Sequence, residues 1–248
     1  MSGGMYLAAA GALVQQMRLN TLANNVANID TVGFKGEMTV FQDPEQGPAS
    51  LPETDADRIQ PLSPYAPPFH TVVDFGQGAL KQTGNPLDVA INGDGFFTIQ
   101  TPDGPQYTRQ GSFTRDEDGT LITPDGYPVL GEGGEITLQA GIIDIDSQGT
   151  IYVNGDEIDR FQVVDFENRL GLQKVGNGRF AAPQDAQTTE PAEITSLNQG
   201  YLEQSNVNAV RAMTEMIETS RAFTAYQKVI QTADDATEKS INDVGKTA

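Results

Sequence analysis

The sequence predicts an α+β protein, in which long N- and C-terminal helices form a coiled-coil-like bundle and flank a central antiparallel all-β domain. Glycine and proline break helices, and no proline occurs before Pro44 or after Pro191, while residues 201–244 contain neither residue. Short β-branched and aromatic runs fill the middle. We therefore divide the chain into an N-terminal helical assembly segment (1–36), an extended Pro-rich linker (37–80), a central β domain (81–195) and a C-terminal helical assembly segment (196–248).

The N-terminal helix is expected over residues 3–28, where apolar residues recur at steps of three and four in two stripes. One stripe consists of Tyr6, Ala10, Leu13 and Met17, and the other of Leu19, Leu22, Val26 and Ile29. The apolar run 7–14 resembles a signal-peptide core, but the first basic residue, Arg18, follows the run instead of preceding it. The run is also too short to span a bilayer. We interpret it as helix in the mature chain.

The C-terminal helix is expected over residues 206–244, with Ser205 or Asn206 as its N-cap. Its apolar stripe consists of Met213, Met216, Phe223, Ile230, Ile241 and Val244. In one interpretation both terminal helices bury their stripes against the middle of their own chain. The alternative is that they pack against each other and against neighbouring molecules. The Ala- and Met-rich stripes favour the second interpretation, since an isolated end helix is only marginally stable without a partner.

The segment 43–69 is rich in proline, which predicts an extended or irregular connector. Strands are expected at 87–91, 96–100, 106–114, 121–123, 142–146, 150–154 and 160–166. Between them lie pairs that accept the positive φ angles of tight hairpins, namely Asn92-Gly93, Asp94-Gly95, Asp103-Gly104, Asp118-Gly119, Asp125-Gly126 and Asn154-Gly155. The middle is therefore predicted to be a chain of β-hairpins.

Composition argues against several classes of function. The net charge of −19, with no Lys- or Arg-rich run, disfavours binding to nucleic acid or to an anionic membrane. The absence of cysteine excludes disulfides and thiolate chemistry, and the single histidine, His70, excludes a multi-histidine metal site within one chain. We expect no cofactor, no metal and no small-molecule substrate.

The acidic residues suggest two kinds of site, a calcium loop and a catalytic pair of carboxylates. Residues 116–119 resemble part of a calcium loop, but the twelfth position from Asp116 is Tyr127, which cannot supply the closing carboxylate. A pair of carboxylates acting as acid and base stays open, as in a hydrolase with a deep cleft. Most acidic residues lie at turns, where they would keep ordinary pKa values. The chain is therefore not expected to be an enzyme.

The segment Ala23-Asn-Asn-Val-Ala-Asn-Ile-Asp-Thr-Val-Gly-Phe-Lys-Gly36 has three asparagines near the end of the first helix. Asparagine is a mediocre helix former but a versatile hydrogen-bonding residue, so we expect it to fix the register of the helices. Gly33 and Gly36 allow a sharp exit from the helix, with Phe34 as an apolar anchor.

This segment, together with residues 84–131 and 200–235, resembles the axial proteins of the bacterial flagellum, the rod and hook subunits. Asp30 stands where that family more often has asparagine. The resemblance implies export by the flagellar type III apparatus without cleavage of the N-terminus, assembly with copies of itself and with other rod proteins, and torque transmission by a rod that spans the periplasm. The chain is not expected to insert into the membrane.

Within the family, the short length and the continuation at residues 128–136 favour the proximal rod over the distal rod or the hook. A secreted β-domain binding module is the alternative outside the family. The assembly interface is predicted to include Leu13, Met17, Leu22, Asn24, Asn25, Val26, Asn28, Phe34, Met213, Met216, Ile217, Phe223 and Ile230.

Overall fold

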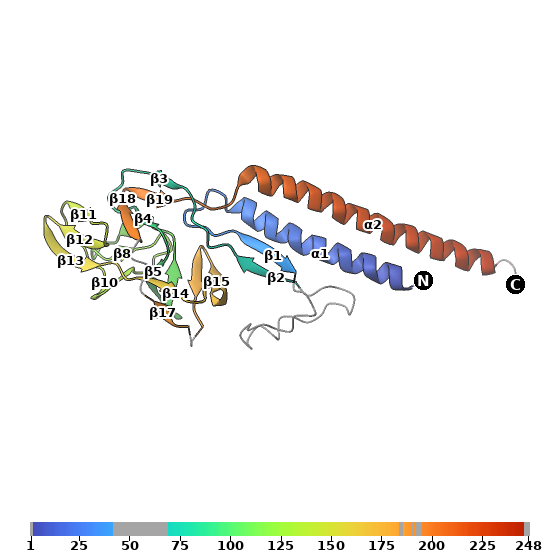
Figure 1. Ribbon diagram of the computed structural model, residues 1–248, viewed down its shortest axis with the longest axis horizontal. Helices are drawn as coiled ribbons and strands as arrows, with labels where there is room; N and C mark the ends of the chain where they lie inside the picture. The colour runs from blue at the N-terminus through green and yellow to red at the C-terminus, as the bar shows by residue number, and fades with distance from the viewer. Residues whose placement is uncertain (1, 42–68, 184–185, 190, 192–194, 246–248) are drawn as a thin grey trace. The chain divides into compact units, whose positions relative to one another are not determined.

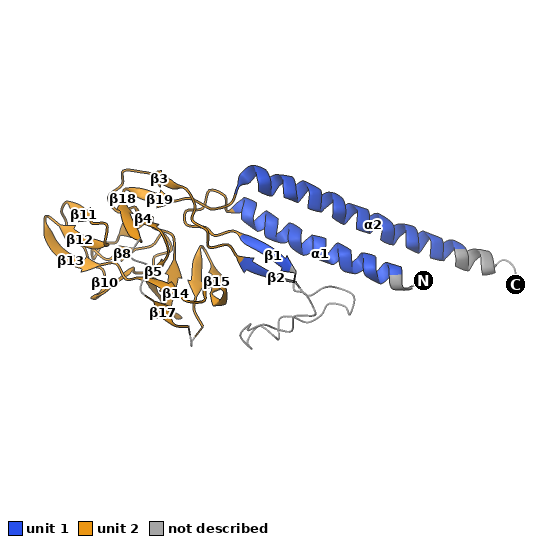
Figure 2. Cartoon of the chain, in the orientation of Figure 1, with its two compact units in different colours: residues 1–27, 37–72, 208–248 blue, residues 28–36, 73–207 orange. Residues whose placement is uncertain are grey.

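The computed structural model describes residues 2–41, 69–183, 186–189, 191 and 195–245 (Figure 1). It confirms an α+β protein with a helix at each end and antiparallel strands between them. The chain forms two compact units (Figure 2). Unit 1 contains residues 1–27, 37–72 and 208–248, and unit 2 contains residues 28–36 and 73–207. Each unit is built from segments that are far apart in the sequence.

Unit 1 is a pair of long helices beside a short hairpin. Helix α1 (Ser2–Ala27) and helix α2 (Ala209–Gly245) lie side by side and antiparallel (Figure 1). Strand β1 (Glu37–Phe41) pairs with β2 (Phe69–Val73) and contacts α1. The predicted linker therefore contains strand at both of its ends, where β-branched residues such as Thr39, Val40 and Val72 favour extended backbone. Its Pro-rich part, residues 42–68, lies outside the described residues.

Helix α2 begins three residues later than the sequence predicts. Its N-cap is Asn208, whose Oδ1 accepts a hydrogen bond from the Arg211 amide at 3.0 Å. The predicted caps, Ser205 and Asn206, were wrong because their side chains serve other backbone groups. Ser205 Oγ accepts from the Val207 amide, and Asn206 Oδ1 accepts from the Gly36 amide.

Unit 2 contains a six-stranded sheet in the order β15-β16-β6-β5-β14-β17 and a three-stranded sheet in the order β11-β12-β13. The first comprises β5 (Phe96–Thr101), β6 (Gly104–Thr108), β14 (Val163–Phe166), β15 (Gln173–Gly176), β16 (Arg179–Ala181) and β17 (Thr188–Thr189). The second comprises β11 (Ile143–Ile145), β12 (Thr150–Val153) and β13 (Asp156–Arg160).

Four two-stranded pairs complete the unit, together with a short 3₁₀ helix, η2 (Arg169–Gly171). They are β3 (Leu80–Gln82) with β19 (Tyr201–Glu203), β4 (Val89–Asn92) with β18 (Ser196–Gln199), β7 (Thr114–Arg115) with β8 (Leu121–Ile122), and β9 (Leu130–Gly131) with β10 (Gly134–Glu135).

The hairpin chemistry read from the sequence is confirmed where the turn lies between two paired strands. Asn154 and Gly155 have φ angles of 56° and 93° and join β12 to β13. The predicted strand 106–114 is interrupted, because β6 ends at Thr108. Gly111 then packs its backbone against Val89, where an added Cβ would lie 1.7 Å from the Val89 carbonyl oxygen. That close contact replaces regular strand geometry.

Two apolar clusters form the interior of unit 2, and both lie within residues 73–207. The larger cluster includes Phe97, Phe113 and Phe161, whose ring centroids are 5.1 to 5.8 Å apart. The smaller cluster is built around Phe96 and Phe180. The antiparallel β-rich middle therefore has an interior of its own.

Candidate assembly site

The inward face of α2 follows a seven-residue repeat. Eight of its buried and half-buried positions alternate at steps of four and three, and they are Ala212, Met216, Thr219, Phe223, Tyr226, Ile230, Ala233 and Thr237. The half-buried Ala209, Glu215 and Ala222 flank this row. This spacing is typical of helices that pair along a coiled-coil seam, although supercoiled packing stays a prediction. Thr219 is buried with its hydroxyl satisfied, because Oγ1 donates to the Glu215 carbonyl at 2.7 Å.

The predicted interface residues of α2 divide between two faces. Met216, Phe223 and Ile230 are half-buried on the inward face. Met213 and Ile217 point away from it, with 51% and 56% of their surfaces exposed. Ile217 and Met213 therefore belong to a short apolar strip with Val210, at steps of three and four on the outer side of the helix.

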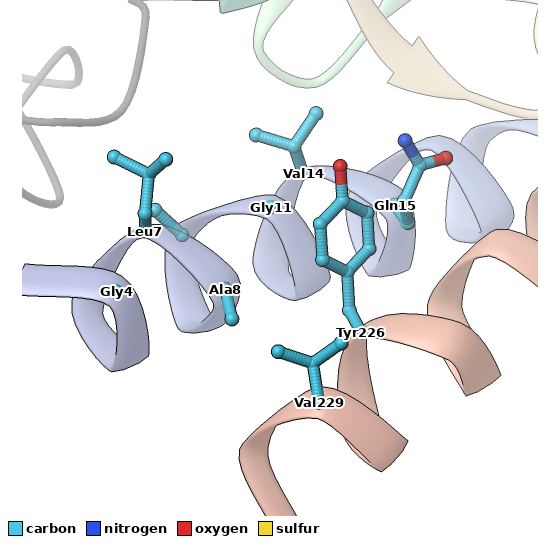
Figure 3. Close-up of a pocket in the computed structure, with 9 residues that line it drawn as sticks. Gly4, Leu7, Ala8, Gly11, Val14, Gln15, Tyr226 and Val229 are labelled. Atoms are coloured by element: carbon cyan, nitrogen blue, oxygen red, sulfur yellow. The ribbon is translucent and has the colours of Figure 1, made fainter. Parts of the chain in front are cut away.

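On α1, small residues allow the closest approach to α2. A Cβ added to Gly11 would lie 2.6 Å from Cε1 of Tyr226, so the tyrosine ring occupies the space that any larger residue would take. Figure 3 shows Tyr226 reaching from α2 across α1 at this point. A groove of about 460 Å³ runs beside the contact, lined by Gly4, Leu7, Ala8, Val14, Tyr226 and Val229 among others.

The N-terminal stripe predicted for α1 is therefore only partly the buried one. Ala10 is buried and Leu13 half-buried, but Tyr6 is 62% exposed and Met17 is 36% exposed. The second stripe fits better, since Leu22 is buried and Leu19, Val26 and Ile29 are half-buried. The inward face near Gly11 carries small residues because α2 approaches closely there. The predicted stripe included large apolar residues, which do not fit such a close approach.

Helix α1 has no segregated polar face. Arg18 is its only charged residue, and Tyr6, Leu7 and Met17 are exposed on it. Residues 4–14 of α1 are apolar or glycine around the whole circumference, whereas exposed polar residues such as Gln16 and Asn20 follow in its second half. A helical segment that is apolar on all sides is normally surrounded by other structure. Among the described elements of unit 1, α1 has its main contacts with α2 and with β1.

The three asparagines near the end of α1 differ in burial and in their hydrogen-bond partners. Asn25 is buried, and its amide pairs with Glu37 on both sides: Nδ2 donates to the carbonyl at 2.7 Å and Oδ1 accepts from the amide at 2.9 Å. This contact ties the end of α1 to the start of β1. Asn28 Oδ1 accepts from the Thr31 hydroxyl at 3.2 Å, whereas Asn24 is exposed. Asn25 therefore joins a helix to a strand, and the fixing of helix register by the asparagines stays a prediction.

Phe34 lies inside unit 2. Its side chain is 3% exposed, and Nζ of Lys174 lies 3.9 Å from the ring centroid. The preceding Gly33 has a φ of 66°, and an added Cβ would meet the Arg109 carbonyl carbon at 2.5 Å. The expected sharp exit from the helix is present, but its anchor is intrachain.

Three charged side chains lie buried beside Phe34 in unit 2. Lys35, Arg109 and Glu203 are each at most 3% exposed. Lys35 Nζ lies 2.6 Å from Glu203 Oε1, and Arg109 Nη1 lies 3.3 Å from Glu203 Oε2. Burial lowers the pKa of the Lys35 ammonium and of the Arg109 guanidinium, and the Glu203 carboxylate opposes both shifts. The sequence alone did not predict this cluster, because Lys35 and Glu203 are 168 residues apart along the chain.

Other expectations concern metals and membranes. Among the described residues, no group of three or more His, Cys, Asp or Glu side chains is placed to hold a metal ion. Asp116 Oδ1 instead accepts from the Asp118 and Thr120 amides, as turn chemistry requires. In the part of the chain that the structure describes, neither helix has the length and apolarity needed to cross a membrane.

Family models match three parts of the chain. "Flagella basal body rod protein" matches residues 5–35, "Flagellar hook protein FlgE/F/G D1 domain" residues 90–153, and "Flagellar basal body rod FlgEFG protein C-terminal" residues 198–243. The flagellar basal-body rod protein FlgF of Rhizobium meliloti is 33% identical, over 99% of each chain. The chain belongs to the flagellar basal-body rod protein family.

Two further relatives carry the name flagellar basal-body rod protein FlgG. That of Buchnera aphidicola (Schizaphis graminum) is 34% identical over 95% of this chain and 97% of its own. That of Bacillus subtilis is 33% identical over 96% and 97%. Membership places this chain in the rod of the flagellar basal body as a structural protein. The matched segments include α1, the motif that follows it and most of α2.

Proposed function

We propose that this rod protein joins the proximal rod, through α1 and the outer face of α2, and that it contacts copies of itself and other rod proteins there. The observation that carries the proposal is the apolar surface of α1, with one charge in 26 residues and with Tyr6 and Leu7 about 60% exposed. Additional helices from neighbouring subunits would cover that surface. Repeated contact between different faces of like subunits builds a helical tube.

The proposal extends to delivery and mechanical role. Export through the flagellar type III apparatus and transmission of torque along the rod are inferred from the family. The short chain and the continuation at residues 128–136 favour the proximal position. The distal rod and the hook are the alternative positions. Coiled-coil packing of α1 with α2 is supported by the seven-residue spacing on α2.

The alternative is a secreted binding module whose terminal helices are buried in its own core. The exposed apolar side chains on the outer face of α2 argue against it. Such a module would not leave Val210, Met213 and Ile217 exposed at 75%, 51% and 56%. The proposal likewise gives the chain no catalytic role.

The test changes the outer face of α2 without touching its inner face. Ile217→Asp is expected to abolish the recovery of motility in a strain lacking this protein and to keep the subunit out of isolated basal bodies. A charge at this position would have to be desolvated in a subunit contact. Circular dichroism of the purified chain should be unchanged, because Ile217 is exposed.

Ala225→Asp is the matched control, since it adds the same charge at an exposed position that continues neither the strip of Val210, Met213 and Ile217 nor the inward seven-residue repeat. It should support motility. Normal incorporation of the Ile217→Asp protein into basal bodies would refute the proposed use of this face.

A further inference from the structure

We propose that Glu203 closes a clasp between residues 33–36, which follow α1, and residues 203–206, which precede α2. The clasp opens as a unit of its own, separately from the larger apolar cluster of unit 2. This conformational device goes beyond the proposed function and does not depend on it. Both segments belong to unit 2, where the chain enters from α1 and leaves toward α2.

Four hydrogen bonds join the two segments directly. The Gly33 amide donates to the Glu203 carbonyl at 2.8 Å, and the Asn206 amide donates to the Phe34 carbonyl at 3.4 Å. Lys35 Nζ donates to Glu203 Oε1 at 2.6 Å, and the Gly36 amide donates to Asn206 Oδ1 at 2.8 Å. Each of the four residues 33–36 therefore contacts residue 203 or 206.

A third segment, residues 74–78, completes the clasp. Lys35 Nζ also donates to the Gly76 carbonyl at 2.9 Å, and the Gly78 amide donates to Glu203 Oε1 at 2.8 Å. Asn206 Nδ2 donates to the carbonyls of Asp74 and Gly76. Gly78 is held so closely that an added Cβ would lie 1.9 Å from the Gln204 carbonyl oxygen. The Glu203 carboxylate is thus the common partner of two cations and one amide.

The contacts that close the clasp are mostly hydrogen bonds and ion pairs, whereas the two clusters in the interior of unit 2 are apolar. Neither of the two apolar clusters of unit 2 includes a residue of 33–36 or 203–206. The segment that follows α1 is therefore held mainly through Glu203 and Asn206, with the Phe34–Lys174 contact beside them. Phe75 lies within the third segment and packs against Phe96 and Phe180 of the smaller cluster. None of the three segments contributes a residue to the larger cluster, so opening the clasp leaves that cluster intact.

The charge balance makes Glu203 the controlling residue. The buried cluster has two cations for one carboxylate, and Arg109 Nε has no hydrogen-bond partner within the described part of the chain. Arg109 gains one further hydrogen bond, from Nη2 to the Gly93 carbonyl at 2.8 Å, and its guanidinium carbon lies 5.4 Å from the centroid of the Phe96 ring. Removing the negative charge would leave two buried cations without compensation, and breaking a buried pair in this way is strongly destabilising.

The test is amide hydrogen exchange on the full-length chain with Glu203→Gln. The Gly33 and Gly36 amides, which donate to Glu203 and Asn206, should exchange about a hundredfold faster. The Leu121 and Val129 amides, which lie in the larger apolar cluster, should keep their protection. Glu132→Gln, which removes a largely exposed carboxylate paired with Arg160, is the control and should change neither set.

Lys35→Met provides a second variant in case the glutamine variant fails to fold. It leaves Glu203 paired with Arg109, so the charges balance, while the contacts of Lys35 to Glu203 and Gly76 are lost. Selective acceleration at Gly33 and Gly36, about tenfold or more, supports the clasp. Unchanged exchange at these amides overturns it, and so does equal acceleration of Leu121 and Val129.

Discussion

At the scale of single residues, the buried ring of Phe34 is expected to stabilise unit 2. Because its ring is 3% exposed and contacts Lys174, Phe34→Ala should destabilise unit 2 by about 3 kcal/mol. Phe34→Leu keeps most of the volume and should cost less than about 1.5 kcal/mol. Urea unfolding of the two purified variants measures both values. A stable Phe34→Ala protein that fails to assemble would instead return Phe34 to the subunit interface.

The ion pair between Asp94 and Arg169 predicts a dependence of stability on pH. The hydrogen bond from Arg169 Nη1, at 2.9 Å, is the main reason that the pKa of Asp94 is lowered. A carboxyl group whose pKa is lower in the folded state stabilises the fold above its unfolded pKa. That contribution is lost as the pH falls through the folded value. Because Asp94 is 51% exposed, the contribution should stay below about 1 kcal/mol.

Asp94→Asn should therefore lower the urea midpoint at neutral pH, and the difference from the unmodified chain should vanish near about pH 2. Asp144→Asn, at an exposed strand position, is the control for removing a carboxylate. A difference that persists unchanged at low pH would show that the asparagine acts through packing and not through the ion pair.

At the scale of elements, the helices were the most predictable part. The absence of Gly and Pro from 201–244 predicted α2, and steps of three and four correctly placed Met216, Phe223 and Ile230 on its inward face. The face of α1 was harder to predict, because Gly11 and the alanines near it are inward for reasons of close approach. That preference depends on Tyr226, more than 200 residues away along the chain.

The strands were predicted where a β-branched or aromatic run lies beside a turn signal, as in β12 and β14. Strand β13, which pairs with β12, was missed because four of its five residues are charged. The hairpin of β15 and β16 was missed, although Asn177 and Gly178, with φ angles of 48° and 68°, provided the same signal. Strands of two or three residues, and pairs such as β3 with β19, leave no local pattern. The clasp was unpredictable for the same reason, since its charges meet only in the folded chain.

The contact between Gly11 and Tyr226 gives an element-scale prediction. Gly11→Leu should weaken the pairing of α1 with α2 by about 2 kcal/mol, because the new side chain needs the space of the tyrosine ring. Adding Tyr226→Ala should recover part of the loss, so that the two changes are not additive. Thermal unfolding followed at the helical circular dichroism signal measures the effect.

Gly4→Leu is the control on the same helix, since nothing lies within 4 Å of a Cβ added there. It should leave the pairing of the helices unweakened. Equal losses in Gly4→Leu and Gly11→Leu would mean that the Tyr226 contact does not determine the pairing.

At the scale of the whole molecule, the two units differ in how their apolar side chains are covered. Unit 2 has two apolar clusters within residues 73–207 and a polar clasp that holds both chain connections. Unit 1 has a helix with one charge and exposed apolar side chains. Unit 2 therefore has its apolar interior within one chain, whereas under the proposed function neighbouring subunits cover α1 further. This asymmetry fits a rod protein that folds its β unit alone and completes its helical unit on assembly.

Truncation tests this asymmetry directly. A chain of residues 28–207 lacks both helices but keeps the clusters, Glu203 and Asn206, so it should stay soluble with the β signal of unit 2 and fail to restore motility. A chain of residues 1–207 keeps α1 without α2, exposes the apolar face around Gly11, and should aggregate. Circular dichroism and analytical ultracentrifugation distinguish the two. Motility restored by 28–207 would show that the helices are not the assembly elements, whereas a melted 28–207 would show that unit 2 depends on them.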